Sequence, residues 1–395
     1  MKKTSVTLIP LLTISLAATT FALTNTAQAC TSLLYKDANG APYAGRTMEL
    51  PMELAYQVSY FPKGSGFTSK IKDHPDLSYQ SKYPFIAITV PDPLDKTLKV
   101  SEGMNDQGLT FSLLAFASTK GPADTIKKTK SILAAIDLGA WTLSQFKNVS
   151  EVKAALKKQP VLVSALLPLG LMKTPFHYTL HDAQGQSVVI EFANGKQTII
   201  DNPIGVMTNG PKFDWHMTNL NNYTFLNNID QSKTTFHGVE FNQPDSGIAT
   251  AGLPASNTSV GRFVRAVYYS QFAEKVDKPD AAMTTLAHIM NNFDRPRGVT
   301  MDERFKEEIA NITAPEVAGH PLYTSEYTSW TALGDLRNLQ FKIKPYSQLN
   351  YISFDLAKLA KEKQPKSIPL SQMPFNVNDV TDWFRKASAK NHQAW

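Results

Sequence analysis

Cys30 is the only cysteine in this chain of 395 residues, and it directly follows the small-residue sequence Ala27-Gln28-Ala29. Signal peptidases cleave after such residues, so we expect the mature chain to begin at Cys30. One residue then carries both a thiol and a free α-amine, with ordinary pKa values of about 8.5 and about 7.7–8.0. Near neutral pH such an amine is partly uncharged and can take the thiol proton, directly or through water. Cys30 therefore combines a nucleophile with its own general base.

Residues 1–29 have the pattern of an export signal. Lys2 and Lys3 supply positive charge, and a mostly apolar run from Val6 to Leu16 follows. This run is too short, and the stretch after it is too often interrupted by Thr and Asn, for a stable membrane span. We therefore expect an exported protein, either periplasmic or secreted.

The composition is that of an ordinary globular protein, with 42% hydrophobic and 19% charged residues. We expect residues 30–395 to form one large domain, because no stretch rich in Pro, Gly or Ser divides them. Loss of the signal lowers the net charge from +6 to +4. So small a charge, without a dense Lys/Arg run, gives no basis for nucleic-acid binding. A lone cysteine cannot form a disulfide within an exported chain, which favours a chemical role for Cys30.

Arg46 and Glu49 are expected beside Cys30. Two alternating stretches flank the turn Asp37-Ala38-Asn39-Gly40 and predict a β-hairpin that returns both residues to the start of its first strand. A guanidinium near a thiol favours the thiolate, which suits Arg46. A carboxylate that accepts hydrogen bonds from an α-amine orients it and raises its pKa, which suits Glu49. The ordinary alternative is a solvated cross-strand pair that contributes little.

Asn209 and Arg262 are further candidates. Asn209 stands in a polar turn after an apolar strand, and a side-chain amide is chemically suited to stabilise an oxyanion. The alternative is that Asn209-Gly210 only forms a turn. Arg262 lies near the start of a predicted helix, where the alternative is a place on its solvated side.

Short antiparallel strands, with helices between them, dominate the pattern of the chain. The expected strands are 31–36, 42–50, 56–61, 85–90, 98–105, 108–114, 177–181, 187–192, 197–200, 205–207, 327–330 and 339–343. The expected helices are 132–146, 149–156 with Ser150 as N-cap, one that begins at Ser259, 279–293 and 378–389. Grouped hairpins followed by helices and a returning hairpin favour an α+β fold with layered antiparallel sheets.

Several short motifs occur in an order that is specific, although each motif is weak alone. They are Ala29-Cys30-Thr31-Ser32, Gly45-Arg46-Thr47-Met48-Glu49, Glu102-Gly103-Met104-Asn105-Asp106-Gln107-Gly108-Leu109, Met207-Thr208-Asn209-Gly210-Pro211, Phe213-Asp214-Trp215, Gly252-Leu253-Pro254, Gly261-Arg262-Phe263-Val264-Arg265, Tyr327-Thr328-Ser329-Trp330 and Asp335-Leu336-Arg337-Asn338. Together they resemble the choloylglycine hydrolase family, which contains bile salt hydrolases and penicillin V acylases. The resemblance covers most of residues 30–350.

The resemblance implies an N-terminal nucleophile hydrolase with an αββα sandwich, in which two antiparallel sheets lie between helical layers. Such proteins are often tetramers and cleave linear amides without a metal or an organic cofactor. By position, Cys30 would be nucleophile and base, and Arg46 would lie beside its thiol. Asn209 would serve the oxyanion, and Arg262 would help to polarise the site. Glu49 stands where the family usually has Asp, so its longer arm would have to fold back to reach the α-amine.

The resemblance implies a small-molecule amide substrate but does not define it. Where bile salt hydrolases tend to carry Asn, and several penicillin V acylases Tyr, this chain has Leu114-Ala115-Phe116. Where some acylases that also cleave acyl-homoserine lactones show Trp, it has Leu50. We expect an apolar pocket for a phenoxyacetyl or fatty acyl group, lined by Phe116, Met48 and Tyr56. Ordinary core packing is the alternative for these three, and an acyl-homoserine lactone acylase of the same mechanism is the alternative activity.

Other classes of protein fit the sequence less well. A non-enzymatic periplasmic lipoprotein, such as a binding protein, would use Cys30 only as the attachment point for lipid, but a lipoprotein signal prefers Leu where this chain has Ala27. A papain-like protease would need a different sequence around its cysteine. A metal-dependent hydrolase would be expected to show a His-Glu-x-x-His helix or paired cysteines, and the sequence has neither.

Overall fold

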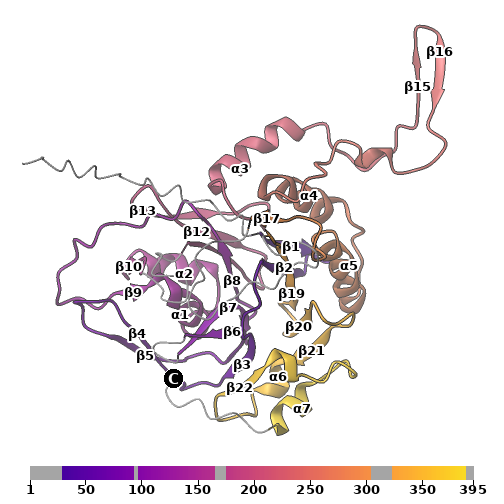
Figure 1. Cartoon of the computed structure of the whole chain (residues 1–395). Helices are drawn as coiled ribbons and strands as arrows, with labels where there is room; N and C mark the ends of the chain where they lie inside the picture. Colours follow the sequence, from indigo (N-terminus) through magenta and orange to yellow (C-terminus); the bar gives the residue numbers. More distant parts are fainter. Residues whose placement is uncertain (1–28, 93–96, 165–174, 304–322, 388–395) are drawn as a thin grey trace, which may run out of the picture.

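The structure is a computed structural model that describes residues 29–92, 97–164, 175–303 and 323–387 (Figure 1). Of the predicted export signal, only Ala29 lies within these ranges. None of the helices in the described ranges combines the length and the apolar character needed to cross a bilayer.

The first sheet has six antiparallel strands in the order β14-β1-β2-β19-β20-β21. Their bounds are β1 (Cys30–Lys36), β2 (Pro42–Leu50), β14 (Val206–Met207), β19 (Tyr327–Asp335), β20 (Gln340–Pro345) and β21 (Ile352–Asp355). The β1–β2 turn is closed by Asp37, whose Oδ1 accepts hydrogen bonds from the N–H groups of Asn39 and Ala41, both at 2.8 Å. This turn fixes the register of the hairpin.

The second sheet has eight antiparallel strands in the order β13-β12-β11-β8-β7-β6-β3-β22. Their bounds are β3 (Gln57–Phe61), β6 (Phe85–Pro91), β7 (Leu98–Asn105), β8 (Thr110–Ala115), β11 (Phe176–His181), β12 (Ser187–Ala193), β13 (Lys196–Asp201) and β22 (Lys366–Pro369). The edge strand β22 pairs with β3, with Ile368 opposite Val58. A late segment of the chain thus completes a sheet that begins near the N-terminus.

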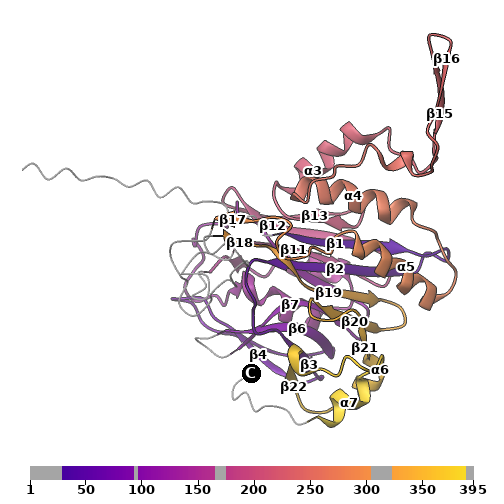
Figure 2. The same ribbon diagram turned by 45° about the vertical axis from the view of Figure 1, so that its right-hand side comes forward.

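Helices cover the outer face of each sheet, which gives four layers and confirms the expected α+β sandwich (Figure 2). Helices α4 (Ser259–Phe272) and α5 (Pro279–Asn291) pack on the first sheet, and α1 (Leu138–Gln145) packs on the second. Buried residues of α2 (Val149–Leu156) join the same hydrophobic cluster as α1. Gly45 lets α5 lie close to β2, because a Cβ there would stand 2.7 Å from the Met290 sulfur. The facing sides of the two sheets form the interior in which the candidate site lies.

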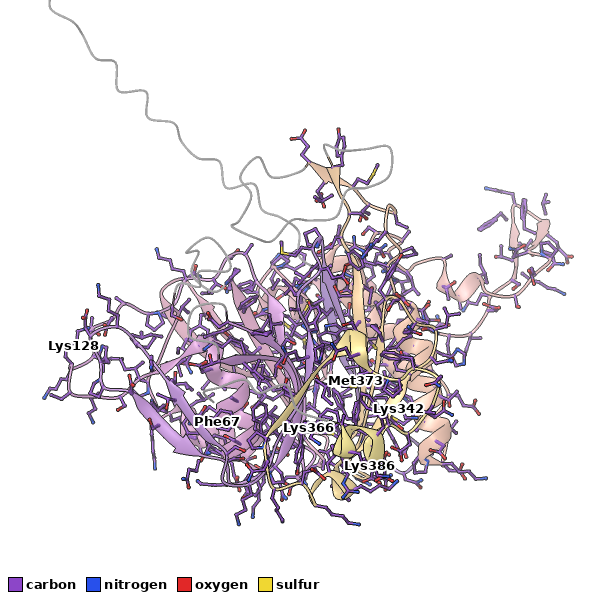
Figure 3. All side chains as sticks on the ribbon, turned by 60° about the horizontal axis from the view of Figure 1, so that its bottom comes forward. Phe67, Lys128, Lys342, Lys366, Met373 and Lys386 are labelled. Atoms are coloured by element: carbon purple, nitrogen blue, oxygen red, sulfur yellow. The ribbon has the colours of Figure 1, made fainter. Side chains whose placement is uncertain are left out.

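The smaller elements are β4 (Gly66–Ser69), β5 (Leu77–Gln80), β9 (Leu133–Ala134), β10 (Val161–Leu162), α3 (Phe213–Asn219), β15 (Lys233–Phe236), β16 (Val239–Asn242), β17 (Asp302–Glu303), β18 (Tyr323–Thr324), α6 (Leu356–Leu359) and α7 (Thr381–Lys386). The sequence reading had missed most of them, because they are short or exposed and carry little apolar periodicity. The hairpin of β15 and β16, called here the projecting hairpin, stands away from the body in every view (Figures 1, 2 and 3).

Two predicted helices differ from the structure where they begin, and the predicted helix 378–389 is shorter, since α7 spans only Thr381–Lys386. The stretch expected to be helical from residue 132 begins with β9 and a 3-10 turn at Ala135–Asp137 before α1 starts. The N-cap of α2 is Asn148 and not Ser150, because the Asn148 side chain accepts a hydrogen bond from the Glu151 N–H at 2.9 Å. Ser150 instead donates its hydroxyl to Gln186 at 2.9 Å.

Candidate active site

Cys30 begins β1 with its side chain on the face that looks toward the second sheet. The register places Cys30 opposite Met48 and Ser32 opposite Arg46, so all four share this face. The Cys30 Sγ lies 3.8 Å from the Met48 sulfur and 3.5 Å from Arg46 Nη2. The expectation that the hairpin brings Arg46 to the thiol is confirmed as geometry.

The Arg46 guanidinium is enclosed between the two sheets and is only 1% exposed. Its Nη2 also donates to the carbonyl oxygen of Leu113 on β8, and its Nε lies 3.3 Å from a carboxylate oxygen of Glu102 on β7. The guanidinium carbon stands 5.0 Å from the ring centre of Trp330 on β19. A permanent positive charge is therefore held beside the thiol by groups from both sheets.

The thiol itself is almost completely buried. Burial raises the pKa of Cys30, whereas the Arg46 charge lowers it and the Glu49 carboxylate raises it further. Hydrogen bonds from the backbone at Ala115 and Glu49 also lower this pKa. Because burial dominates, the thiol keeps its proton near neutral pH unless a base removes it.

Asn209 holds the nitrogen of Cys30. In the chain described here this nitrogen is an amide joined to Ala29, and it donates to Asn209 Oδ1 at 2.7 Å. The Asn209 side-chain nitrogen donates to the carbonyl of Ala115 at 2.8 Å. That nitrogen has two hydrogens, so one remains for an oxyanion. Asn209 lies in a turn, as the simpler alternative held, but its side chain also binds the backbone nitrogen of Cys30.

Arg262 is buried and not on a solvated helix side, so that alternative is wrong. Thr258 caps α4 by accepting from the Gly261 N–H at 3.2 Å, which points this first turn at β1. Arg262 Nη1 donates to the Cys30 carbonyl and, at 2.9 Å, to the Thr31 hydroxyl. Its Nη2 donates to Asn209 Oδ1 at 2.7 Å. Arg262 thus links the helix layer to both residues.

Successive side chains of a strand point to opposite faces, and the residue numbers of Arg46 and Glu49 differ by an odd number. Glu49 therefore lies on the opposite face of β2 from Arg46. Both are fully buried, so the alternative of a solvated pair is wrong. The Glu49 Oε1 accepts from the Thr328 hydroxyl at 3.3 Å, and burial raises the pKa of Glu49 to about 7 while the Arg262 charge lowers it. With Ala29 attached, the Cys30 nitrogen binds Asn209 and not Glu49. A contact between Glu49 and a free α-amine remains a prediction.

Ala29 is bound by groups that the sequence reading did not identify. Its N–H donates to the Glu326 carboxylate, and its carbonyl accepts from the Glu49 N–H at 3.0 Å. Glu326 is in turn paired with Arg295, and both are buried. No local pattern marks Glu326 or Arg295 because their partners lie far away in sequence. Glu102 belongs to one of the motifs found in the sequence. Its contact with Arg46 was not predicted, because that contact joins strands of two different sheets.

The three residues expected to line an acyl pocket all lie in the buried interior. Met48 contacts the thiol directly. Tyr56 meets Trp330 edge-on, with ring centres 5.8 Å apart, next to the Arg46 charge. Phe116 stacks on His177, with ring centres 4.8 Å apart. Their positions fit both core packing and a pocket wall, and the lining role remains a prediction.

Comparison with known proteins identifies the family. The model of the linear amide C–N hydrolases of the choloylglycine hydrolase family matches residues 30–367. The chain belongs to the choloylglycine hydrolase family. It is accordingly a hydrolase of linear amide C–N bonds, as the order of the motifs had led us to expect.

Curated relatives include hydrolases with two kinds of substrate in their names. A bile salt hydrolase/transferase from Clostridium perfringens is 27% identical over 285 residues, which is 72% of this chain and 85% of the relative. A penicillin V acylase from Pectobacterium atrosepticum is 24% identical over 379 residues, covering 91% of this chain and 89% of the relative. The chain therefore matches most of the length of both.

Solved structures confirm the fold. A variant of the conjugated bile acid hydrolase from Clostridium perfringens aligns with a TM-score of 0.70 at 24% identity, over 86% of this chain and 96% of that one. A penicillin V acylase from Agrobacterium tumefaciens aligns with a TM-score of 0.66 at 22% identity, over 86% and 92%. The fold is the N-terminal nucleophile hydrolase sandwich.

The buried carboxyl of Glu102 predicts how stability depends on pH. Burial raises its pKa from the ordinary value to about 8, although Arg46 and Ser112 lower it. The folded state thus keeps a proton that the unfolded state releases above its ordinary pKa, so the free energy of unfolding falls as pH rises from about 4.5 to about 8. Glu102→Gln removes this titration. We expect the fall in Tm between pH 5.5 and 8.5, measured by circular dichroism, to be smaller in this variant than in the wild type.

The control is Glu303→Gln, which changes a carboxylate on β17, where the side chain is exposed and lies outside the projecting hairpin. It should reproduce the wild-type dependence of Tm on pH. Equal slopes for Glu102→Gln and the wild type would show that Glu102 titrates in the folded protein as it does in the unfolded chain.

Proposed function

We propose that this protein is an exported amidohydrolase that forms an acyl-enzyme on Cys30 and cleaves the amide between an apolar acyl group and an amine. The observation that carries the proposal is the surroundings of Cys30. Its Sγ lies 3.5 Å from the Arg46 guanidinium, and its nitrogen lies 2.7 Å from Asn209 Oδ1. When the chain begins at Cys30, that nitrogen is an amine held next to its own thiol.

The proposed reaction uses one residue as nucleophile and base. The α-amine accepts the thiol proton while Sγ attacks the amide carbonyl of the substrate, and the second hydrogen of the Asn209 amide stabilises the oxyanion. The amine then passes the proton to the leaving nitrogen, the C–N bond breaks, and a thioester remains on Cys30. Water attacks the thioester and gives its proton to the α-amine, and the C–S bond breaks to release the acid. Arg46 stabilises the thiolate in both half-reactions.

The proposed substrate carries a phenoxyacetyl, bile acyl or fatty acyl group. Relatives named for penicillin V and for bile salts support an apolar acyl portion. Met48 lies 3.8 Å from the Cys30 sulfur, and Tyr56 and Phe116 add apolar side chains to the buried interior. Acyl-homoserine lactones offer the same kind of amide, so they belong to the same screen.

We propose that Cys30 is free of lipid. Cys30 is only 2% exposed, and its Sγ points between the two sheets toward Arg46. A diacylglyceryl group on this sulfur would have to displace the guanidinium and the surrounding side chains. The buried position therefore favours a reactive thiol over an anchoring one.

We expect Cys30→Ala to fold and to lack amidase activity, because it removes the atom that forms the acyl-enzyme. Release of free amine from penicillin V, conjugated bile salts and acyl-homoserine lactones measures the activity. Cys30→Ser is the matched variant, and its weaker nucleophile should leave a small fraction of the wild-type rate. Wild-type activity in Cys30→Ala, with an unchanged Tm, would refute the mechanism.

The state of the N-terminus can be measured directly. We expect the intact mass of the exported protein to correspond to a chain that starts at an unmodified Cys30. The free amine is the proposed base, so a mass that includes lipid or upstream residues in an active preparation would overturn the mechanism. The same measurement on Cys30→Ala shows whether cleavage before residue 30 needs the thiol.

We also propose that the protein assembles with copies of itself, as a homotetramer, through the projecting hairpin. Phe236 and Phe241 on this hairpin are 61% and 52% exposed, and Val239 beside them is also exposed. A two-stranded hairpin is marginally stable alone, and both of its edges lack a neighbouring strand within the described residues. An identical hairpin related by a twofold axis would cover the aromatic rings and pair an edge.

Light scattering after gel filtration tests this assembly. The wild type should have a mass several times that of one chain, and the double variant Phe236→Ser with Phe241→Ser should have a smaller mass. Leu349→Ser is the control, because Leu349 is a single exposed apolar residue elsewhere on the surface. A monomeric wild type, or an unchanged mass in the double variant, would contradict the proposal.

A further inference from the structure

The Asn209 turn is held from outside the site by two buried histidines. His177 Nε2 lies 2.9 Å from the carbonyl oxygen of Thr208, and His216 Nε2 lies 2.9 Å from the carbonyl oxygen of Asn209. Both rings are fully buried. The Asn209 N–H is fixed as well, since it donates to the Ser259 hydroxyl at 2.9 Å. The backbone that carries the Asn209 amide is therefore tied at three points.

The hydrogen bonds determine where the protons lie. A carbonyl oxygen only accepts, so each Nε2 carries a hydrogen. Burial lowers the pKa of His216 to about 4, and its Nδ1 has no hydrogen-bond partner among the described residues. His216 is therefore neutral near pH 7. His177 differs, because its Nδ1 lies 3.4 Å from Glu191 Oε1.

Glu191 connects His177 to the start of α3. The same Oε1 accepts from the N–H of Phe213, the first residue of that helix, at 2.9 Å. Glu191 lies on β12, the strand beside His177, and both side chains face the first sheet. A continuous path of hydrogen bonds therefore runs from α3 through Glu191 and His177 to Thr208, next to Asn209.

His177 also supports Phe116. The two rings are stacked, with centres 4.8 Å apart and planes only 2° from parallel. Phe116 directly follows β8, whose Ala115 carbonyl receives the Asn209 amide hydrogen. One imidazole thus contacts both the turn that carries the proposed oxyanion donor and the ring proposed to line the acyl pocket.

We propose that His177 is a positioning residue with two separable functions: its Nε2–H holds Asn209 for the chemical step, and its ring face holds Phe116 for binding of the acyl group. This inference rests on the proposed function, because it acts through Asn209 and Phe116. His177 touches no reacting atom. Its contribution to rate passes through the Thr208 carbonyl, and its contribution to substrate affinity passes through the Phe116 ring.

Two substitutions separate these functions. His177→Phe keeps a flat ring under Phe116 but has no donor for the Thr208 carbonyl. His177→Gln places an amide N–H where Nε2 stood but has no aromatic face. We expect kcat for penicillin V to fall about tenfold or more in His177→Phe with KM changed less than about threefold. We expect the reverse in His177→Gln, with KM raised about tenfold and kcat changed less than about threefold.

The same pair of changes at His181 is the matched control. His181 is buried on the same strand and face, but its Nε2 meets the Ser32 hydroxyl at 3.4 Å, away from the Asn209 turn and Phe116. His181→Phe and His181→Gln should lower Tm without separating kcat from KM. If a His177 variant does not fold, His216→Phe and His216→Gln test the donor alone, and only the former should lose kcat.

The outcomes distinguish the inference from the function on which it rests. A wild-type enzyme that cleaves no amide in the screen removes the proposed function. If the wild type is active but both His177 variants change kcat by one factor and KM by one factor, as expected for the His181 variants, the positioning role is overturned. Opposite changes in the two variants support it.

Discussion

The guanidinium of Arg46 carries a permanent charge and is enclosed between the two sheets, where it needs polar partners from both of them. A buried charge is tolerated only where polar partners replace its hydration. These partners come from strands far apart in the chain: the thiol of Cys30, the carbonyl of Leu113 and the carboxyl of Glu102. Both sheets must be in register before all three meet. Contacts that join the two sheets thus also surround the thiol.

Buried carboxyl groups lie on both sides of the first sheet: Glu102 of β7 meets Arg46 on the inner side, and Glu49 of β2 points to the opposite side. Burial raises the pKa of Glu102 to about 8 and of Glu49 to about 7, close to the ordinary value for an α-amine. A carboxyl that loses a proton can offset an amine that gains one. If the chain begins at Cys30, as proposed, such an exchange would keep the net charge of the interior nearly constant and so lower the electrostatic cost of moving a proton there.

The sequence was sufficient to predict the positions of residues where short-range features, such as a turn, decide the structure. The turn at Asp37 fixed the hairpin register and so placed Arg46 beside Cys30, and ordered motifs located Asn209 and Arg262. Strand alternation alone would have put Glu49 on the other face from Arg46. The pairs Arg46–Glu102 and His177–Glu191 could not be read in this way, because each depends on how strands are ordered in a sheet or how the sheets face each other. Such contacts leave no local periodicity.

The burial of Ala29 and Cys30 determines whether a peptidase could cut between them before or after the chain folds. Ala29 is 4% exposed, with its N–H on Glu326 and its carbonyl on the Glu49 N–H, and Cys30 is already paired within the first sheet. A protease binds its substrate as an extended, accessible strand, and the folded protein offers no such strand at this bond. A peptidase that cuts before Cys30 must therefore act while β1 is still unpaired. If the chain is cut before Cys30, as proposed, cleavage would precede folding, and the new amine would be buried only when β1 pairs within the sheet.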